Sequence, residues 1–172
     1  MFKFIRNLVL VGTVGLLAAS NAFAGASPQT TTFLVSTTVI KSCIVTATPL
    51  AFGNYDQIAA AATTGTSTIS LQCTNGAAAV MALNGGINGN ESQRKMKDSV
   101  SGNQLNYQLY TTAANTNVWG DTTSGTVTQT YNSTNPATVQ PFTVYGTIPA
   151  QQNVAISASN TYQDTITVTV TF

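Results

Sequence analysis

Few residues in this chain could carry acid–base or metal chemistry. The sequence contains no histidine, which removes the commonest general base and most metal sites. Its acidic residues are spread over different predicted turns: Asp56, Glu91, Asp98, Asp121 and Asp164. Aspartate in a turn usually accepts hydrogen bonds from nearby backbone N–H groups, whereas a glycosidase needs two carboxyl groups roughly 5–10 Å apart. We therefore expect no catalytic residue, no metal site and no cofactor.

Three other segments could bind a ligand, and each has a simpler structural interpretation. Residues 84–90 are rich in glycine but contain no lysine and no GxGxxG pattern, so they indicate a loop rather than a phosphate site. Trp119 could stack on a sugar ring, although a single tryptophan is more often packed in a core or turn. The basic run at residues 94–97 is typical of a solvated turn.

Residues 1–24 have the features of a secretory signal peptide. Lys3 and Arg6 precede an apolar stretch at residues 8–19, and residues 22–24 form an A-x-A-like cleavage site. The apolar stretch is shorter than the roughly 20 residues of a membrane span, so we expect an exported chain without membrane insertion. Without this segment the chain has fewer basic than acidic residues, which argues against a nucleic-acid partner.

Charged residues make up only 6% of the sequence, against about a quarter in an average protein. Copies of such a chain can pack closely with little electrostatic repulsion. The cysteines are Cys43 and Cys73. In an exported chain a lone pair most simply forms a disulfide, here worth roughly 3.5 kcal/mol in the chain-entropy model. Two cysteines without histidine do not make a usual zinc site.

Short runs of alternating apolar and polar residues, separated by turn residues, indicate an all-β sandwich or barrel. Almost no helix is expected, and the alanine-rich residues 57–62 are interpreted as a loop. Pro141 suggests a sheet edge or a bulge at that point. The predicted strands cover residues 31–40, 41–46, 67–73, 78–83, 105–109, 126–131, 139–145 and 162–172.

The last predicted strand has a one-sided apolar face. Ile166, Val168, Val170 and Phe172 alternate with threonines, and no further strand is predicted that could pair with this one. A long apolar edge is normally blunted by lysine, proline or a bulge, and none of these occurs there. Either an upstream strand of the same chain or a strand of another chain is expected to cover it.

Several motifs occur in an order that resembles the spore coat protein U family, which includes pilin subunits of archaic chaperone–usher pili. They are Ser42-Cys43-Ile44-Val45, residues 49–56 (PLAFGNYD), 71–73 (LQC), 83–86 (LNGG), 105–110 (LNYQLY), 119–121 (WGD), 144–151 (VYGTIPAQ) and 162–165 (YQDT). One departure is Ser159-Asn160-Thr161, where the family tends to have a glycine before the YxDT segment. Asparagine tolerates the positive φ that such a turn requires.

The resemblance implies an incomplete immunoglobulin-like β-sandwich that is completed by donor-strand exchange, a form of β-strand addition. It divides the chain into a signal peptide (1–24), a donor segment (25–40) and a pilin domain (41–172). The expected donor residues are Phe33, Val35, Thr37 and Val39, and the expected edge of the acceptor groove is Ile166, Val168, Val170 and Phe172. The implied partners are identical or related pilin subunits, a periplasmic chaperone and an outer-membrane usher, and the implied location is the cell surface.

Two other functions remain open at this point. One is a coat protein deposited on a cell or spore surface, which would share the same fold. The other is a secreted carbohydrate-binding module that uses Trp119, Tyr107 and Tyr110 on one face. Such a module would be a monomer whose own N-terminal strand folds back over the terminal edge.

Overall fold

The computed structural model describes residues 27–156 and 161–172 of the chain. Two units can be distinguished, one extending to Thr38 and one formed by Val39–Phe172. The predicted signal peptide and the predicted turn residues Ser159 and Asn160 lie outside the described residues.

The N-terminal unit, described for residues 27–38, contains no helix or strand. Every side chain in it is exposed, including those of Phe33 (85%) and Val35 (79%). The prediction of a formed strand at residues 31–40 is therefore wrong for this chain alone. The physical reason is that alternating side chains suit a sheet, but a strand gains its hydrogen bonds only from a neighbour.

The second unit consists of strands with a single 3₁₀ turn among the described residues, which confirms the all-β prediction. The strands are β1 (Cys43–Ala47), β2 (Thr63–Cys73), β3 (Ala78–Leu83), β4 (Arg94–Asp98), β5 (Gln104–Tyr110), β6 (Gln129–Asn132), β7 (Gln140–Ile148), β8 (Tyr162–Gln163) and β9 (Val168–Thr171). The 3₁₀ turn is η1 (Thr123–Gly125).

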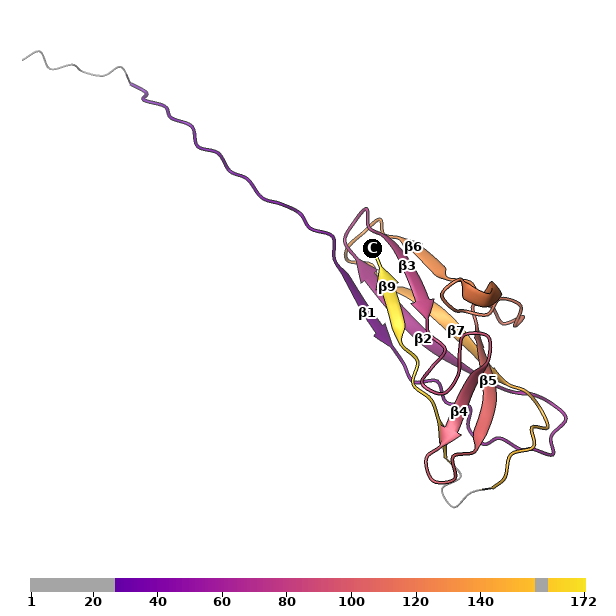
Figure 1. Ribbon diagram of the computed structural model, residues 1–172. Helices are drawn as coiled ribbons and strands as arrows, with labels where there is room; N and C mark the ends of the chain where they lie inside the picture. The colour runs from indigo at the N-terminus through magenta and orange to yellow at the C-terminus, as the bar shows by residue number, and fades with distance from the viewer. Residues whose placement is uncertain (1–26, 157–160) are drawn as a thin grey trace, which may run out of the picture. The chain divides into compact units, whose positions relative to one another are not determined.

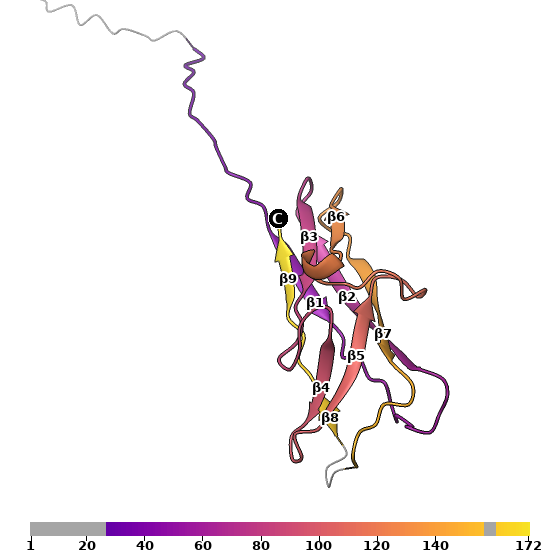
Figure 2. The same cartoon turned by 45° about the vertical axis from the view of Figure 1, so that its right-hand side comes forward.

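These strands form two sheets that pack as an immunoglobulin-like sandwich (Figure 1). The larger sheet has the order β1-β2-β7-β5-β4-β8, and the smaller has the order β6-β3-β9. All pairings within them are antiparallel. Figure 2 shows the second layer, with β9 beside β3.

The core lies between the two sheets because apolar residues alternate along the central strands. In β2, Ile69 and Leu71 are buried, and in β3, Met81 and Leu83 are buried. Their chain neighbours point to the opposite face, as the two-residue period of a strand requires. The larger sheet is stapled at one edge by the predicted disulfide, because Cys43 and Cys73 lie directly opposite each other in β1 and β2.

Pro141 lies where β7 has a neighbour on one side only. It faces Ser70 of β2, while β5 pairs with β7 only from Tyr145 to Thr147. A residue without an N–H group is tolerated at such a locally open edge. The prediction of an edge position is confirmed, although β7 is a central strand over the rest of its length.

The predicted single strand over residues 162–172 is wrong, because two short strands in different sheets replace it. β8 pairs with β4 in the larger sheet, and β9 pairs with β3 in the smaller one. Residues 164–167 cross from one layer to the other. A regular alternation continues through this crossing, so periodicity alone gives no sign of it.

The predicted solvated turn at residues 94–97 is also wrong. These residues belong to β4, and both Arg94 and Asp98 are completely buried. The error arose because charged residues are seldom fully buried unless they are paired. Here the buried Arg94 and Asp98 share one face of the strand with the half-buried Met96, whereas Lys95 and Lys97 lie on the other.

Candidate functional site

The two sheets present open edges next to each other. β1 is the terminal strand of the larger sheet and β9 that of the smaller, and they lie side by side in both Figure 1 and Figure 2. Among the described residues, β1 pairs only with β2 and β9 only with β3. Each strand therefore has one row of backbone N–H and C=O groups available to a further strand.

The side chains along these edges point into the sandwich but are incompletely covered. Val45 of β1 lies opposite the buried Leu71, yet 39% of its surface is exposed. Val168 and Val170 of β9 lie opposite the buried Leu83 and Met81, and both are only half-buried. These apolar residues face the core side and still contact water, which shows that the sandwich is open between β1 and β9.

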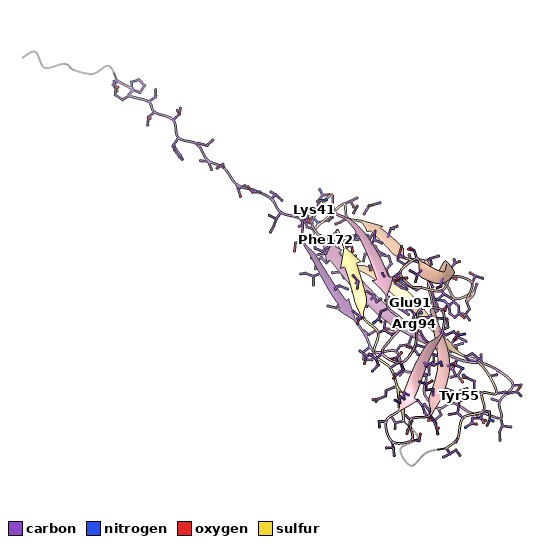
Figure 3. The ribbon with its side chains drawn as sticks, viewed as in Figure 1. Lys41, Tyr55, Glu91, Arg94 and Phe172 are labelled. Carbon is purple, nitrogen blue, oxygen red and sulfur yellow. A yellow bond between two sulfur atoms is a disulfide. The ribbon has the colours of Figure 1, made fainter. Side chains whose placement is uncertain are left out.

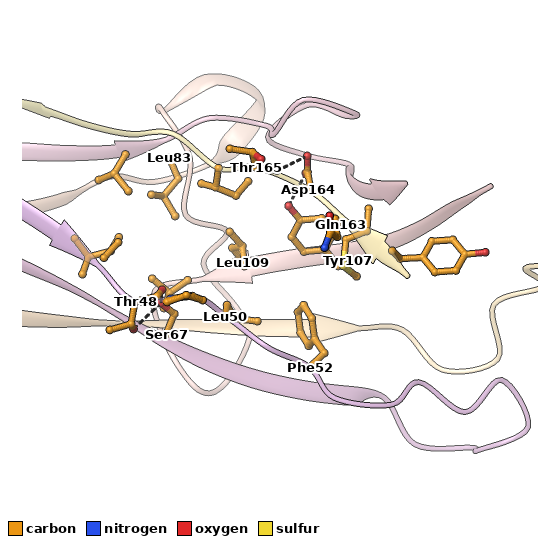
Figure 4. A pocket seen from close by; sticks show the side chains of 18 residues that line it. Thr48, Leu50, Phe52, Ser67, Leu83, Tyr107, Leu109, Gln163, Asp164 and Thr165 are labelled. Atoms are coloured by element: carbon orange, nitrogen blue, oxygen red, sulfur yellow. Dashed lines mark hydrogen bonds between the residues drawn. The ribbon is translucent and has the colours of Figure 1, made fainter. Parts of the chain in front are cut away.

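A groove of about 460 Å³ lies along this opening (Figure 4). Residues 47–50 and Phe52 form one wall, and residues 162–166 and Val168 form the other. Its floor is built from buried apolar side chains of both sheets: Ile69, Leu83, Leu109 and Val144. A groove with apolar lining and two free strand edges can accept an extended peptide by strand addition.

A pair of glycines positions the first wall. Gly65 and Gly146 lie opposite each other in β2 and β7, and Leu50 and Phe52 lie directly over them. A Cβ atom added at Gly146 would approach Phe52 Cζ to 2.8 Å and Leu50 Cδ1 to 2.9 Å. Only glycine leaves room for this packing, so the two positions set how closely the wall approaches the sheet.

The far end of the groove is closed by a polar contact. The Tyr107 hydroxyl donates to Asp164 Oδ2 at 2.7 Å (Figure 4), and Asp164 Oδ1 accepts from the backbone N–H of Ile87 at 2.9 Å. Burial, followed by the bond to Asp164, raises the pKa of Tyr107 well above its usual range. The phenol therefore remains a hydrogen-bond donor that ties the crossing residues to β5, while the Asp164 carboxylate ties them to the loop at residues 84–90.

That loop needs glycine at position 86. Gly86 has φ of +81°, and a Cβ atom added there would lie 1.9 Å from Asp164 Oδ2. The predicted loop at residues 84–90 is confirmed as a loop. It packs on the carboxylate that closes the groove.

Besides Tyr107 and residues 163–165, the groove contains a polar position on its β2 side. Ser67 is 91% buried, with 9% of its surface exposed, and its hydroxyl donates to the carbonyl oxygen of Thr48. The Thr48 hydroxyl oxygen accepts from the backbone N–H of Thr68 at 3.0 Å and lies 3.2 Å from Ser67 Oγ. Both Ser67 and Thr48 line the groove (Figure 4).

A second hollow of about 830 Å³ continues from the far end. It shares Leu50, Phe52, Met96 and Tyr162 with the first. Further apolar residues line it, among them Leu105, Ile148 and Val154. The hollowed surface is thus longer than the groove between the strand edges.

The opposite corner of the sandwich is closed around Arg94 and Trp119, both fully buried. The Arg94 guanidinium donates to the carbonyl oxygens of Asn84 at 2.8 Å and Trp119 at 2.7 Å, and Figure 3 shows it beside Glu91, whose carbonyl oxygen it also contacts. Desolvation lowers the pKa of Arg94 from its usual value. The Trp119 indole donates to the carbonyl oxygen of Met81 at 3.1 Å.

This burial overturns the predicted sugar-binding face. Trp119 has no exposed surface, and Tyr107 is buried in the groove. An indole must be exposed to stack on a sugar ring, so the carbohydrate-binding hypothesis that used Trp119, Tyr107 and Tyr110 is wrong. Packing in the core, the other interpretation of Trp119, is confirmed.

The predicted acceptor residues are distributed along the open edge. Ile166 and Val168 line the groove, Val170 lies further along β9, and Phe172 follows that strand with 47% of its surface exposed. The expected donor residues Phe33, Val35 and Thr37 belong to the separately described N-terminal unit, and Val39 is the first residue of the second. The donor and acceptor roles stay predictions.

Two of the predicted aspartate turns are confirmed. Asp56 Oδ1 accepts from the backbone N–H of Ile58 at 2.9 Å, and Asp121 Oδ1 accepts from that of Thr123 at the same distance. The bonds from Thr123 lower the pKa of Asp121. The wall formed by residues 47–50 and Phe52 was not predicted from the sequence. The sequence feature that could have indicated it is the PLAFGNYD motif at residues 49–56.

The described part of the chain contains no group of three or more metal-ligating side chains. No helix within it is long and apolar enough to cross a membrane.

Comparison with known proteins shows which family this chain is similar to. The family model of the Spore Coat Protein U domain matches residues 29–169. Protein U of Myxococcus xanthus is 36% identical over 134 residues, which cover 72% of this chain and 71% of that protein.

A solved structure shares the fold. It is the crystal structure of the CsuC–CsuE chaperone–tip adhesion subunit pre-assembly complex from archaic chaperone–usher Csu pili of Acinetobacter baumannii. The matched chain is 25% identical, with a TM-score of 0.55, over 78% of this chain and 41% of that chain. This chain therefore spans less than half the length of its structural relative. On the family match and the identity to Protein U, the chain belongs to the Spore Coat Protein U domain family.

Proposed function

We propose that this chain is a structural subunit of a surface pilus that is assembled by the chaperone–usher route through donor-strand exchange. Its role would be to build a fibre that supports adhesion or biofilm formation. The observation that carries the proposal is the apolar groove between β1 and β9, where two sheet edges lack a strand between them among the described residues. The groove is shaped for a single extended segment.

The proposed occupant is the donor segment of a second copy, residues 33–39. Phe33, Val35, Thr37 and Val39 share one face of an extended chain, and the apolar members of this set are exposed. Burying a phenylalanine or valine side chain contributes about 1.5–3 kcal/mol. Backbone bonds to both open edges add roughly 1 kcal/mol each, so the joint between subunits would be long-lived.

Export and assembly need two further partners. A subunit with an open groove exposes apolar side chains and strand edges that would otherwise aggregate. We infer that a periplasmic chaperone covers the groove first and that an outer-membrane usher exchanges the chaperone for the next subunit's donor segment. The likeness to a chain from a chaperone–subunit complex supports this order of events. The fibre would then lie at the cell surface.

The family and the fold are those of structural subunits, and we propose that this chain likewise is not an enzyme. A second candidate is a coat protein on a cell or spore surface, favoured by the family's name and by the identity to Protein U. Both candidates use the same sandwich. They differ in whether the groove is filled by another copy in a linear fibre.

Gel electrophoresis of the exported protein, with and without boiling, tests the proposal. We expect a ladder of oligomers in the unboiled sample that collapses to the monomer band on boiling. Deletion of residues 25–39 should abolish the ladder and leave the chaperone complex intact. A single monomer band in both lanes, from well-folded protein, would contradict donor-strand exchange.

A further inference from the structure

We propose that Ser67 and Thr48 form a polar subsite within the groove that receives Thr37 of the incoming donor strand. The contact would fix which donor residue lies at which point of the groove. This inference rests on the donor-strand exchange proposed above and specifies its register. We call the pair Ser67 and Thr48 the polar subsite.

The subsite combines the buried Ser67 with the exposed Thr48. The other polar lining residues of the groove are Tyr107 and residues 163–165. Along β2, Ser67 lies between the buried Ile69 and Gly65, over which Leu50 and Phe52 pack. Figure 4 shows Ser67 and Thr48 on the wall opposite β9, on the Leu83 side of Leu109. A donor side chain that reaches this point meets oxygen atoms, whereas at the neighbouring points it meets carbon.

The hydrogen bonds already present determine what the subsite can accept. The Ser67 hydroxyl hydrogen is directed to the carbonyl oxygen of Thr48, and Thr48 Oγ1 accepts from the backbone N–H of Thr68. A hydroxyl has one hydrogen and two lone pairs, so Ser67 Oγ retains acceptor capacity. The ligand that fits is a short side chain with an O–H to donate, which threonine supplies and valine does not.

The donor segment contains one such residue on the face that carries its apolar side chains. Phe33, Val35 and Val39 are apolar, and Thr37 is the single polar member of that set. The opposite face has Ser36 and Thr38 next to each other in the alternation, which would place two hydroxyls in consecutive positions of the groove. The hydroxyl pair of Ser67 and Thr48 thus matches the single polar residue on this face of the donor.

Orientation then assigns the remaining donor residues. An immunoglobulin-like sandwich is built from antiparallel sheets, so the added strand is expected to run antiparallel to β9. Alternate residues of a strand are about 6.8 Å apart. With Thr37 at Ser67, Val35 and Phe33 lie successively towards Val170 and Phe172, and Val39 lies towards Leu50 and Leu109.

Shifts of the donor strand by one residue and by two residues would both be unfavourable. A shift of one residue turns the apolar side chains out of the groove. A shift of two residues keeps the apolar face inward but takes the Thr37 hydroxyl away from Ser67 and places a valine, Val35 or Val39, against the oxygen atoms of the subsite, which then lose that hydrogen bond. The subsite thus distinguishes between registers that apolar contacts alone would accept almost equally.

Cysteine cross-linking of assembled fibres tests the register directly. Three double variants each carry Ser67→Cys. The second cysteine of each replaces Val35, Thr37 or Val39. The matched controls are Ser36→Cys and Thr38→Cys, which the proposal places on the outward face. Oxidised fibres are boiled and run without reductant, so that only covalently linked subunits persist as oligomers.

We expect the strongest cross-link from Thr37→Cys. A strongest cross-link from any of the other four positions would overturn the register while leaving strand exchange intact. Absence of ladders from every chain before oxidation, with folded protein, would instead contradict the proposed function on which the register rests.

A double-mutant cycle provides a second readout with milder changes. Dissociation of subunits from fibres is followed in a fixed concentration of denaturant for Thr37→Val, Ser67→Ala and the combination. A net hydrogen bond corresponds to about a fivefold faster dissociation when it is lost. We expect this acceleration for Thr37→Val in the native groove, none in the Ser67→Ala groove, and little change for Thr37→Ser. Equal effects of Thr37→Val in both grooves would overturn the contact.

Discussion

β3 and β1 show how differently the two sides of this sandwich are completed. β3 has a neighbour on each side, β6 and β9, and its inward Ala79, Met81 and Leu83 are buried. β1 has β2 on one side only, and its inward Val45 remains 39% exposed. Both strands consist mainly of apolar residues, CIVTA in β1 and AAVMAL in β3. Burial in this sandwich therefore depends on the number of neighbouring strands rather than on the apolar character of the strand itself.

The two sides of the sandwich also differ in how their backbone polar groups are hydrogen-bonded. On the closed side, Arg94 and Trp119 satisfy backbone carbonyls within the chain. On the open side, the edges of β1 and β9 have no strand partner among the described residues. The closed side is expected to determine whether the subunit folds, and the open side whether subunits join.

The largest effect is expected from Val35→Asp in the donor segment. A carboxylate buried in an apolar groove without a partner is strongly unfavourable, so assembly should be lost while the chaperone-bound subunit stays folded. Ser36→Asp is the control, because its side chain lies on the outward face. The measurement is the unboiled gel. Normal ladders from Val35→Asp would show that residue 35 does not enter the groove.

A large effect on folding is expected from Arg94→Met on the closed side. The substitution leaves buried carbonyl oxygens of Asn84 and Trp119 without their donor, at a cost of about 3 kcal/mol in the free energy of unfolding. Urea unfolding of the exported protein can be followed by the fluorescence of Trp119. Lys97→Met, on the exposed face of the same strand, should change the free energy by less than about 0.5 kcal/mol. Similar effects of the two changes would refute the structural role of Arg94.

A smaller effect is expected from Tyr107→Phe at the boundary between the two sides. The change removes the bond from the Tyr107 hydroxyl to Asp164 and should reduce the free energy of unfolding by about 1 kcal/mol. Tyr110→Phe removes the same atom from a half-buried side chain on the outer face and serves as the control in the same urea titration. If Tyr107→Phe also loosens the end of the groove, subunits should dissociate faster from fibres in denaturant. An unchanged unfolding curve would show that this bond adds nothing to stability.

The smallest effect is expected from Asp121→Asn near the closed corner. Hydrogen bonds from Thr123 lower the pKa of Asp121 in the folded state. Its contribution is therefore present above the unfolded pKa of about 3.9 and is lost as the pH falls through the lower folded pKa. Comparison of urea midpoints at pH 7 and at acid pH should show a weaker pH dependence in Asp121→Asn. An identical pH dependence in both proteins would contradict a stabilising contribution of the Asp121 carboxylate.

Much of the fold could be predicted from alternation and turn residues. The prediction of β3 is confirmed residue for residue, and the pairing of Cys43 with Cys73 is confirmed. β4 was missed because its buried Arg94 and Asp98 look like solvent-facing residues in a sequence. The burial of Arg94 depends on the carbonyl oxygens of Asn84 and Trp119, which no local pattern contains. Asp98 instead accepts hydrogen bonds from the adjacent turn.

The groove was predictable in part. The alternation of Ile166, Val168 and Val170 indicated an apolar edge, but not that residues 164–167 cross between layers. The opposite wall depends on Leu50 and Phe52 packing over Gly65 and Gly146, a contact between segments far apart in the sequence. Residues 33–39 have the pattern of a strand and form none in the described structure. An alternating pattern makes a segment suitable for a sheet, but it does not supply the neighbouring strand that the segment must pair with.

The Cys43–Cys73 disulfide has a mechanical consequence in a fibre built as proposed. Tension between subunits would enter the sandwich through the donor segment and reach Cys43 a few residues after Val39. There the covalent bond to Cys73 transfers the load directly to the long central strand β2, so the short ladder between β1 and β2 would not have to bear it. Pulling single fibres before and after reduction would show whether the rupture force falls when this path is cut. A subunit held in this way would behave as a link whose weakest point is the groove, not its own fold.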